Sequence, residues 1–141
     1  MQLASGQGYP RETLLKMVEQ VPTFRAIKDW AGNVPQHEMH IRTLQSLPRP
    51  VNVLTTHSAW LFSSLVLGCN GLLSGSGSVI ADLQAELFRA VQANNLAEAK
   101  RVNDRIYPLA RVFYADPWAD MHNRMKEALV LLGKDAARDA A

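Results

Sequence analysis

The residue of this sequence best suited to chemistry is Lys28, which follows the short, largely apolar run 24–27. Burying an ammonium group is costly, so a lysine in apolar surroundings tends to lose its proton. A neutral amine is a nucleophile that attacks carbonyl carbons to form a Schiff base. The alternative is that Lys28 lies one residue past a strand and is solvated. The segment therefore predicts either a Schiff-base lysine or an ordinary surface lysine.

Three other groups of residues have side chains or backbone suited to chemistry. His57 follows a predicted strand, where it would contact a substrate or form a hydrogen bond within its loop. The Gly-Ser-Gly-Ser loop at 75–78 precedes a predicted helix, so it would bind a phosphate or form a tight turn, although it lacks the lysine of a P-loop. His37, Glu38 and His40 lack a third metal ligand. We interpret them as a surface cluster at a helix start and expect no metal.

Alternating strands and helices position these residues. The β-branched and apolar runs predict strands at about 24–28, 51–56 and 71–75. Apolar spacing predicts helices through 41–47, 59–67 and 80–94, with Ser58 as the N-cap of the second. This alternation predicts an α/β fold with a parallel sheet. Two more amphipathic helices follow, one through 99–113 and one through 119–133.

Composition excludes several classes of protein. With 48% hydrophobic and 20% charged residues, the chain is globular rather than disordered. The net charge of +2 is spread along the chain without a basic patch, so no nucleic-acid partner is expected. The single cysteine, Cys69, excludes an internal disulfide and fits a reducing cytoplasm. The longest apolar run, 59–67, falls short of the ~20 residues that span a bilayer, so we expect a cytoplasmic protein without a membrane partner.

Three separate pieces of the chain resemble one known family, the pyruvate-dependent class I aldolases and lyases typified by dihydrodipicolinate synthase and N-acetylneuraminate lyase. The Ala-Ile-Lys-Asp segment at 26–29 is similar to the family's sixth strand, which carries its Schiff-base lysine. Residues 68–74 resemble the junction of its seventh helix and eighth strand. Asp116-Pro117, residues 126–129 and Gly133 resemble its last two helices. The order and spacing of these pieces agree with the family along nearly the whole chain.

The resemblance implies a (β/α)₈ TIM barrel, a fold that typically needs about 250 residues. We expect this chain to be the C-terminal half of such a barrel, with strands 5 to 8 followed by C-terminal helices. Residues 1–95 would form the partial barrel, from a remnant of strand 5 at 1–3 through helix 8, and residues 96–141 a helical extension of the same domain. The family's glycine-threonine-threonine segment and its proton-relaying tyrosine would precede Met1. The chain would then associate with the missing N-terminal half or form a homo-oligomer.

In the implied barrel, the strands alternate inward and outward side chains. Phe24, Ala26 and Lys28 are expected to point into the barrel, and Arg25 and Ile27 toward the helices. Val53 and Leu73 are also expected to point inward. Small Ala26 would leave room beside the amine of Lys28.

The resemblance implies a Schiff-base-forming lyase, an aldolase or dehydratase that acts on pyruvate or a sugar-derived 2-keto acid without a cofactor. Lys28 would be the catalytic amine, and Leu73, Ser74 and His57 would contact the substrate. The loop ending at His57 and the loop at 75–78 depart from the family's pattern, which favours a sugar-derived acid over dihydrodipicolinate synthesis. The alternative is a non-catalytic fragment or association module that retains the fold of the barrel half.

Overall fold

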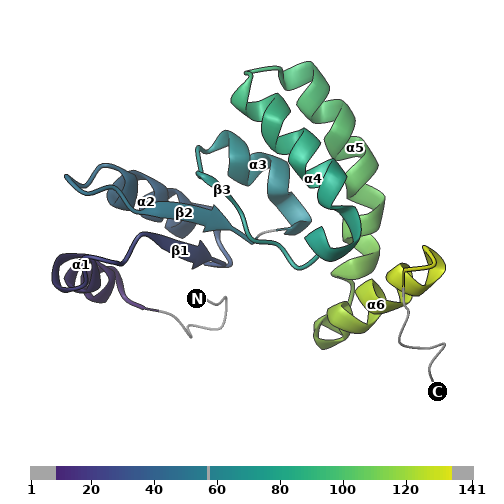
Figure 1. The fold of residues 1–141 in the computed structure, drawn as a ribbon, viewed down its shortest axis with the longest axis horizontal. Helices are drawn as coiled ribbons and strands as arrows, with labels where there is room; N and C mark the ends of the chain where they lie inside the picture. The colour runs from purple at the N-terminus through teal and green to yellow at the C-terminus, as the bar shows by residue number, and fades with distance from the viewer. Residues whose placement is uncertain (1–8, 57, 135–141) are drawn as a thin grey trace. The chain divides into compact units, whose positions relative to one another are not determined.

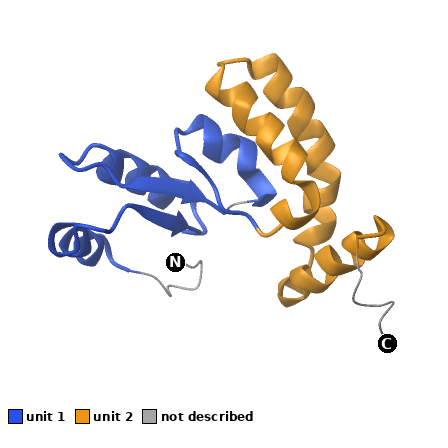
Figure 2. Cartoon of the chain, in the orientation of Figure 1, with its two compact units in different colours: residues 1–74 blue, residues 75–141 orange. Residues whose placement is uncertain are grey.

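The structure is a computed structural model of the 141-residue chain, and it describes residues 9–56 and 58–134. The chain divides into two compact units, Met1–Ser74 and Gly75–Ala141 (Figure 2). The expected strand remnant at 1–3 and the predicted substrate residue His57 lie outside the described residues. The expected split into a barrel part and an extension at residue 95 stays a prediction about the complete barrel.

The first unit contains the parallel sheet (Figure 1). Its three strands are hydrogen-bonded in the order β1-β2-β3, and both pairs are parallel. Each crossover between them contains a helix, so the α/β fold class predicted from the sequence is confirmed. In chain order the elements are α1 (Arg11–Gln20), β1 (Ala26–Asp29), α2 (Val34–Gln45), β2 (Asn52–Thr55), a 3₁₀ turn (Ser58–Trp60), α3 (Leu61–Val66) and β3 (Gly71–Leu72).

One face of this sheet is covered by helices. Ile27 and Val53 are neighbours in register and both are buried, as are Leu44 of α2 and Leu65 of α3. The prediction that Ile27 points toward the helices is confirmed. The prediction that Val53 points into the barrel, on the same face as Lys28, is wrong. Its register partner is Ile27 rather than Lys28, and register partners in a sheet point to the same face.

The start of β1 is held by one arginine from the loop before β2. The Arg49 guanidinium donates to the carbonyl oxygens of Pro22 at 3.1 Å and Phe24 at 2.8 Å. It also donates to the carbonyl of Val18, in the last turn of α1, and to the carbonyl of Val21, directly after the helix. Carbonyls at a helix C-terminus have no partner within the helix. The side chain of Arg49 therefore connects the end of α1 to the residues just before β1, the strand that contains Lys28.

The turn into α3 differs from the sequence prediction. Ser58 opens a 3₁₀ turn and is not the N-cap of the helix, a position that Trp60 occupies. The Ser58 hydroxyl instead contacts the hydroxyl of Ser74, beyond the end of β3. This long-range contact takes the place of the expected local cap.

The second unit is helical, with α4 (Gly77–Gln92), α5 (Leu96–Phe113), a 3₁₀ turn (Trp118–Asp120) and α6 (Met121–Leu131). The predicted succession of three helices is confirmed. The first begins at Gly77, but the backbone of Ile80 is non-helical (φ −124°, ψ 40°), so a kink separates its opening turn from the main helix, which starts close to the predicted residue 80. The Gln84 amide donates to the buried Ser76 hydroxyl at 2.8 Å. Among the described residues, no helix is long and apolar enough to cross a membrane.

Candidate active site at the carboxyl end of the sheet

Lys28 lies inside β1, one residue before its end, rather than one residue past the strand. Its side chain is half-buried, and Ala26 on the same face is exposed, whereas Ile27 and Asp29 on the opposite face are buried. The predicted alternation is therefore confirmed within this strand. It places the amine-bearing side chain on the sheet face that the helices of the first unit leave uncovered.

The register partner of Lys28 is a leucine that is not among the predicted site residues. Leu54 of β2 pairs with Lys28, and Gly71 of β3 pairs with Leu54. A Cβ atom on Gly71 would lie 3.3 Å from Leu54 Cδ2, so the glycine leaves room for the leucine side chain to lie over it. Periodicity alone could not find Leu54, because it does not give the register of two parallel strands.

Two of the predicted substrate residues follow β3 directly. Leu73 lies two residues after Gly71, on the same face as Lys28 by alternation, and its side chain is 52% exposed. Its N–H donates to the Thr55 carbonyl at 2.8 Å, which extends the pairing beyond the strand. Ser74 is half-buried and contacts Ser58. The carboxyl ends of all three strands thus meet at one edge of the sheet.

The loop at 75–78, for which phosphate binding and a tight turn are the two alternatives, overlaps the start of α4. Gly77 and Ser78 belong to the first turn of α4, and the Ser76 hydroxyl accepts from the Gln84 amide. A Cβ atom on Gly77 would lie 3.0 Å from Gln84 Oε1, so this side chain packs directly against the loop. These contacts favour the tight-turn alternative over a phosphate cradle.

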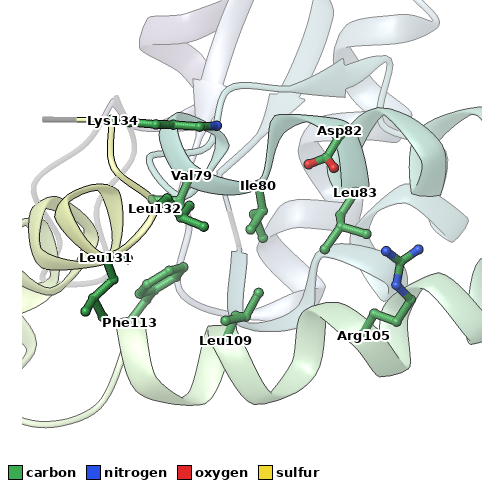
Figure 3. Close-up of a pocket in the computed structure, with 11 residues that line it drawn as sticks. Val79, Ile80, Asp82, Leu83, Arg105, Leu109, Phe113, Leu131, Leu132 and Lys134 are labelled. Atoms are coloured by element: carbon green, nitrogen blue, oxygen red, sulfur yellow. The ribbon is translucent and has the colours of Figure 1, made fainter.

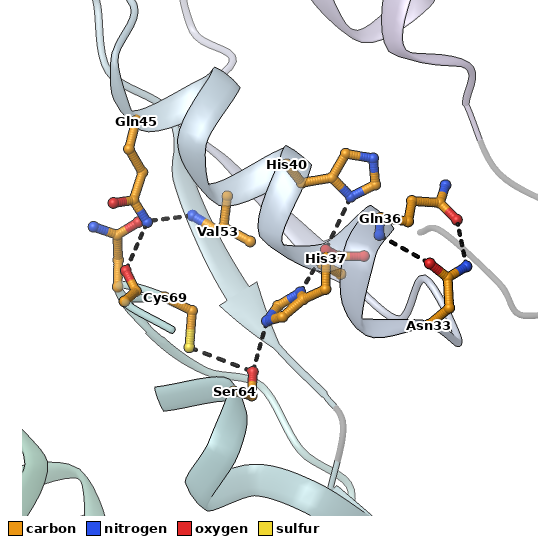
Figure 4. Close-up of polar contacts among 11 residues, drawn as sticks. Asn33, Gln36, His37, His40, Gln45, Val53, Ser64 and Cys69 are labelled. Carbon is orange, nitrogen blue, oxygen red and sulfur yellow. Dashed lines mark hydrogen bonds and ion pairs between the residues drawn. The ribbon is translucent and has the colours of Figure 1, made fainter. Parts of the chain in front are cut away.

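The opposite face of the sheet holds a buried polar cluster (Figure 4). Nδ1 of His37 lies 2.7 Å from Asp29 Oδ2, and Nδ1 of His40 lies 2.9 Å from the same oxygen. Asp29 and His37 are fully buried and His40 is 1% exposed, so the interpretation of these histidines as a surface cluster is wrong. Only Glu38, which pairs with the exposed Arg42 at 2.6 Å, faces solvent as expected.

The sequence held a signal for this burial. His37 and His40 lie three residues apart, and Ile41 and Leu44 follow at the fourth and seventh positions from His37. That spacing is the buried stripe of an amphipathic helix. Both imidazoles therefore occupy core positions of α2, where each requires a hydrogen-bonding partner.

The hydrogen bonds decide the charge of Asp29. Burial raises the pKa of this carboxyl group, but the hydrogen bonds from His37 and His40 outweigh burial and lower the pKa from 3.8 to about 2. An ionised carboxylate only accepts hydrogen bonds, so both Nδ1 atoms must carry protons. The two histidines therefore act as donors to a buried anion.

The cluster continues from His37 to the turn before β3. His37 Nε2 lies 2.7 Å from the Ser64 hydroxyl of α3, and Ser64 Oγ lies 3.7 Å from Cys69 Sγ. In a neutral His37 with its proton on Nδ1, Nε2 accepts from the Ser64 hydroxyl. Burial raises the pKa of the Cys69 thiol, with Ser64 opposing it, so this cysteine is a structural thiol.

Carboxylate, imidazole and hydroxyl stand here in the order of a hydrolase triad. Ser64 is fully buried, however, so its hydroxyl cannot reach a substrate. The distances are those of hydrogen bonds between side chains, and no group of three His, Cys, Asp or Glu in the described chain is arranged to hold a metal ion. The cluster is therefore a structural network behind the lysine strand.

A pocket of about 460 Å³ lies within the helical unit, between α4, α5 and α6 (Figure 3). Its walls are mainly apolar, and Asp82, Arg105 and Lys134 are its charged lining residues. None of the predicted site residues lines it. The pocket therefore adds nothing to the site at the sheet edge.

Together, the parallel sheet and the lysine at its carboxyl edge define an α/β chain of the kind that carries chemistry at the ends of its strands. A family model described as "Dihydrodipicolinate synthetase family" matches residues 3–139. The chain belongs to this family, which confirms the resemblance noted in the sequence.

Individual relatives agree with this assignment. The chain is 34% identical over 110 residues to a 4-hydroxy-tetrahydrodipicolinate synthase of Erythrobacter litoralis, covering 74% of this chain and 35% of that protein. It is 24% identical over 109 residues to an Escherichia coli protein named "Probable 2-dehydro-3-deoxy-D-pentonate aldolase YjhH", covering 77% of this chain and 36% of that protein. The chain thus spans about a third of the length of these curated relatives.

A solved structure shows the same fold. The dihydrodipicolinate synthase of Aquifex aeolicus superposes with a TM-score of 0.78 at 19% identity, covering 96% of this chain and 45% of that chain. Nearly all of this chain therefore corresponds to less than half of a dihydrodipicolinate synthase chain.

Proposed function

We propose that Lys28 forms a Schiff base with pyruvate or a sugar-derived 2-keto acid, and that the protein to which this sequence belongs is an aldolase or dehydratase. The observation that carries the proposal is the position of Lys28 within β1, at the carboxyl edge of the sheet and on its uncovered face. Membership of the family supports the same chemistry.

The proposed reaction begins with attack of the Lys28 amine on the ketone carbon. A carbon–nitrogen bond forms, and the ketone oxygen leaves as water after proton transfer. The resulting protonated imine accepts the electron pair of a neighbouring carbon–carbon or carbon–hydrogen bond, which allows cleavage, condensation or loss of water. Leu54, Leu73 and Ser74 would line the space beside the imine, and His57 is a further candidate.

The substrate class rests on two observations. One relative is named a 2-dehydro-3-deoxy-D-pentonate aldolase, and a 2-dehydro sugar acid is a 2-keto acid, the class of carbonyl compound that a lysine amine would attack. The loop ending at His57 and the Gly-Ser-Gly-Ser loop depart from the family's pattern, which favours a sugar-derived acid.

The test is trapping of the imine on the complete protein to which this sequence belongs. Pyruvate with borohydride should convert Lys28 to a secondary amine, located by mass spectrometry of the peptide that contains it. Lys28→Ala should abolish that adduct. Lys28→Arg should do the same, because a guanidinium stays protonated and does not add to a ketone.

The controls separate a specific imine from ordinary lysine chemistry. Lys16 is exposed on α1 and should be labelled equally weakly in every variant. Labelling of wild-type Lys28 no greater than that of Lys16 would contradict the proposal. Full turnover is expected only where an acid–base group is also positioned, since such a group contributes about 10² to 10⁴ in rate.

A second candidate function is association, favoured by the exposed sheet face. We propose that strands 5 to 8 of a TIM barrel are present here as a barrel half, whose face would meet a complementary half or a second copy. Leu73 is 52% exposed on that face, and β1 and β3 each pair with β2 alone among the described strands. We also propose that the partner in this association is the complementary barrel half or a second copy of the chain. A cytoplasmic location is likewise part of the proposal.

A further inference from the structure

We propose that Asp29 is a positioning residue for Lys28, and that His37 and His40 hold it in place. This inference rests on the proposed Schiff-base function and extends it to the opposite face of the sheet. The three residues would set the direction of the lysine side chain without touching the substrate.

Both histidines hold Asp29 through the same carboxylate oxygen. Asp29 Oδ2 accepts from Nδ1 of His37 at 2.7 Å and from Nδ1 of His40 at 2.9 Å. Both donors come from the buried stripe of α2, so they cannot move apart without moving the helix. Two charge-assisted hydrogen bonds from one rigid element fix the position of the carboxylate.

A second set of contacts fixes the ring of His37 in α2. His37 Nε2 is bonded to Ser64 of α3 at 2.7 Å, and its ring meets Trp60 edge-on with centroids 5.4 Å apart. The neighbouring Ser64 contacts Cys69, in the turn before β3. The imidazole of His37 therefore has no free direction of rotation, and the carboxylate that it holds is equally confined.

The backbone carries this constraint to Lys28. Successive side chains of a strand point to opposite faces, so the direction of the Asp29 side chain sets that of Lys28. The Asp29 carbonyl also accepts from the Thr56 N–H at 3.1 Å, which ties the end of β1 to the end of β2. Rotation of the strand at residue 28 would break the carboxylate contacts and this backbone bond together.

Packing α2 against the sheet does not require polar residues at these positions. Asp29 Oδ1 and His40 Nε2 are buried without a hydrogen-bond partner among the described residues, which is costly. An apolar residue at position 29 would avoid both the buried charge and these unpaired atoms. A positioning role accounts for a carboxylate at this place directly after the lysine.

The experiment compares imine trapping in wild type, Asp29→Ala and Asp29→Asn, at a temperature where circular dichroism shows all three folded. The alanine variant should lower the maximal rate of adduct formation at Lys28 by about tenfold or more, since a misplaced reacting group costs up to about 10²-fold. The pyruvate concentration that gives half the maximal rate should stay the same. The asparagine variant should recover most of the rate, because its amide oxygen still accepts from both imidazoles.

Matched variants keep the test decisive. If Asp29→Ala does not fold, His40→Leu removes one of the two donors while leaving an apolar side chain in the core, and it should slow trapping to a smaller extent. His122→Leu, at an exposed histidine of α6, is its control and should have no effect.

The outcomes separate this inference from the proposed function. Equal rates in wild type and a folded Asp29→Ala, or no recovery in a folded Asp29→Asn, would overturn the positioning role alone. Absence of a Lys28 adduct in wild type would overturn the Schiff-base function and the positioning role with it.

Discussion

At the scale of single residues, Asp29 shows two opposing effects on one carboxyl group. Burial favours its protonated form, whereas hydrogen bonds from two imidazoles favour its ionised form, and the hydrogen bonds prevail. The folded chain therefore binds the proton of Asp29 more weakly than the unfolded chain does. This difference makes stability depend on pH.

The sign of the dependence follows from the lowered pKa. The contribution of Asp29 is fully present above its ordinary pKa of 3.8 and is lost as the pH falls toward about 2. A shift of this size corresponds to about 2 kcal/mol of unfolding free energy. We expect Asp29→Asn to be less stable than wild type by about that amount at pH 6, with the difference shrinking between pH 4 and pH 2.

Urea unfolding of the two proteins at pH 6, 4 and 3 would measure this difference. Other carboxyl groups titrate in both proteins, so their effects cancel in the comparison. The partly exposed carboxylate of Glu98 has a pKa that is also lowered, chiefly by its hydrogen bond to Arg101. Glu98→Gln is therefore a control with a much smaller expected loss. A gap between wild type and Asp29→Asn that is constant with pH would contradict the assigned cause.

At the scale of elements, α2 is the helix that presents the buried imidazoles. Its first turn is capped by Asn33, whose side-chain oxygen accepts from the Gln36 N–H at 2.8 Å. Its buried stripe places His37 and His40 against the sheet. The Asn33 cap thus lies one helical turn before His37, which holds Asp29.

The caps of two helices in different units allow a matched comparison. Asn95 caps α5 as Asn33 caps α2, accepting from the Glu98 N–H at 3.1 Å. Each asparagine-to-alanine change should cost about 1 kcal/mol, whereas Asn33→Asp should retain the cap. Amide hydrogen exchange should show faster exchange in α2 for Asn33→Ala and in α5 for Asn95→Ala. Acceleration of both helices in either variant would show that the two units unfold as one.

At the scale of the whole molecule, both outer strands of the sheet have an edge that no other described strand pairs with. Among the described strands, β1 and β3 each pair with β2 alone, and Leu73 is exposed on the uncovered face. Unpaired strand edges and exposed apolar side chains favour pairing with another chain. The barrel-half proposal therefore predicts that the isolated chain self-associates.

Sedimentation over a range of concentrations would measure this association, with near-UV circular dichroism reporting tertiary packing. Leu73→Lys should weaken self-association, because a lysine beside an open edge opposes strand pairing. Leu131→Lys is its control, since Leu131 is 87% exposed in the helical unit and away from the sheet edges in sequence. A monomer that is independent of concentration and has a sharp near-UV signal would contradict the barrel-half proposal.

The sequence by itself determined the elements and the family. Apolar periodicity and turn residues indicated the order of strands and helices, because both depend on local backbone preferences. The alternation within β1 placed Ala26 and Lys28 on one face and Ile27 on the other, as the structure shows. The three matching pieces of sequence identified the family that the comparisons confirm.

Only the tertiary structure decided which residues meet. Asp29, His37 and Ser64 come from a strand and two helices, and their contacts depend on how α2 and α3 pack on the sheet. Leu54, rather than Val53, is the neighbour of Lys28 because of the strand register, which period-two patterns leave undetermined. Long-range packing and register are properties of several segments at once, so no single stretch of sequence could specify them.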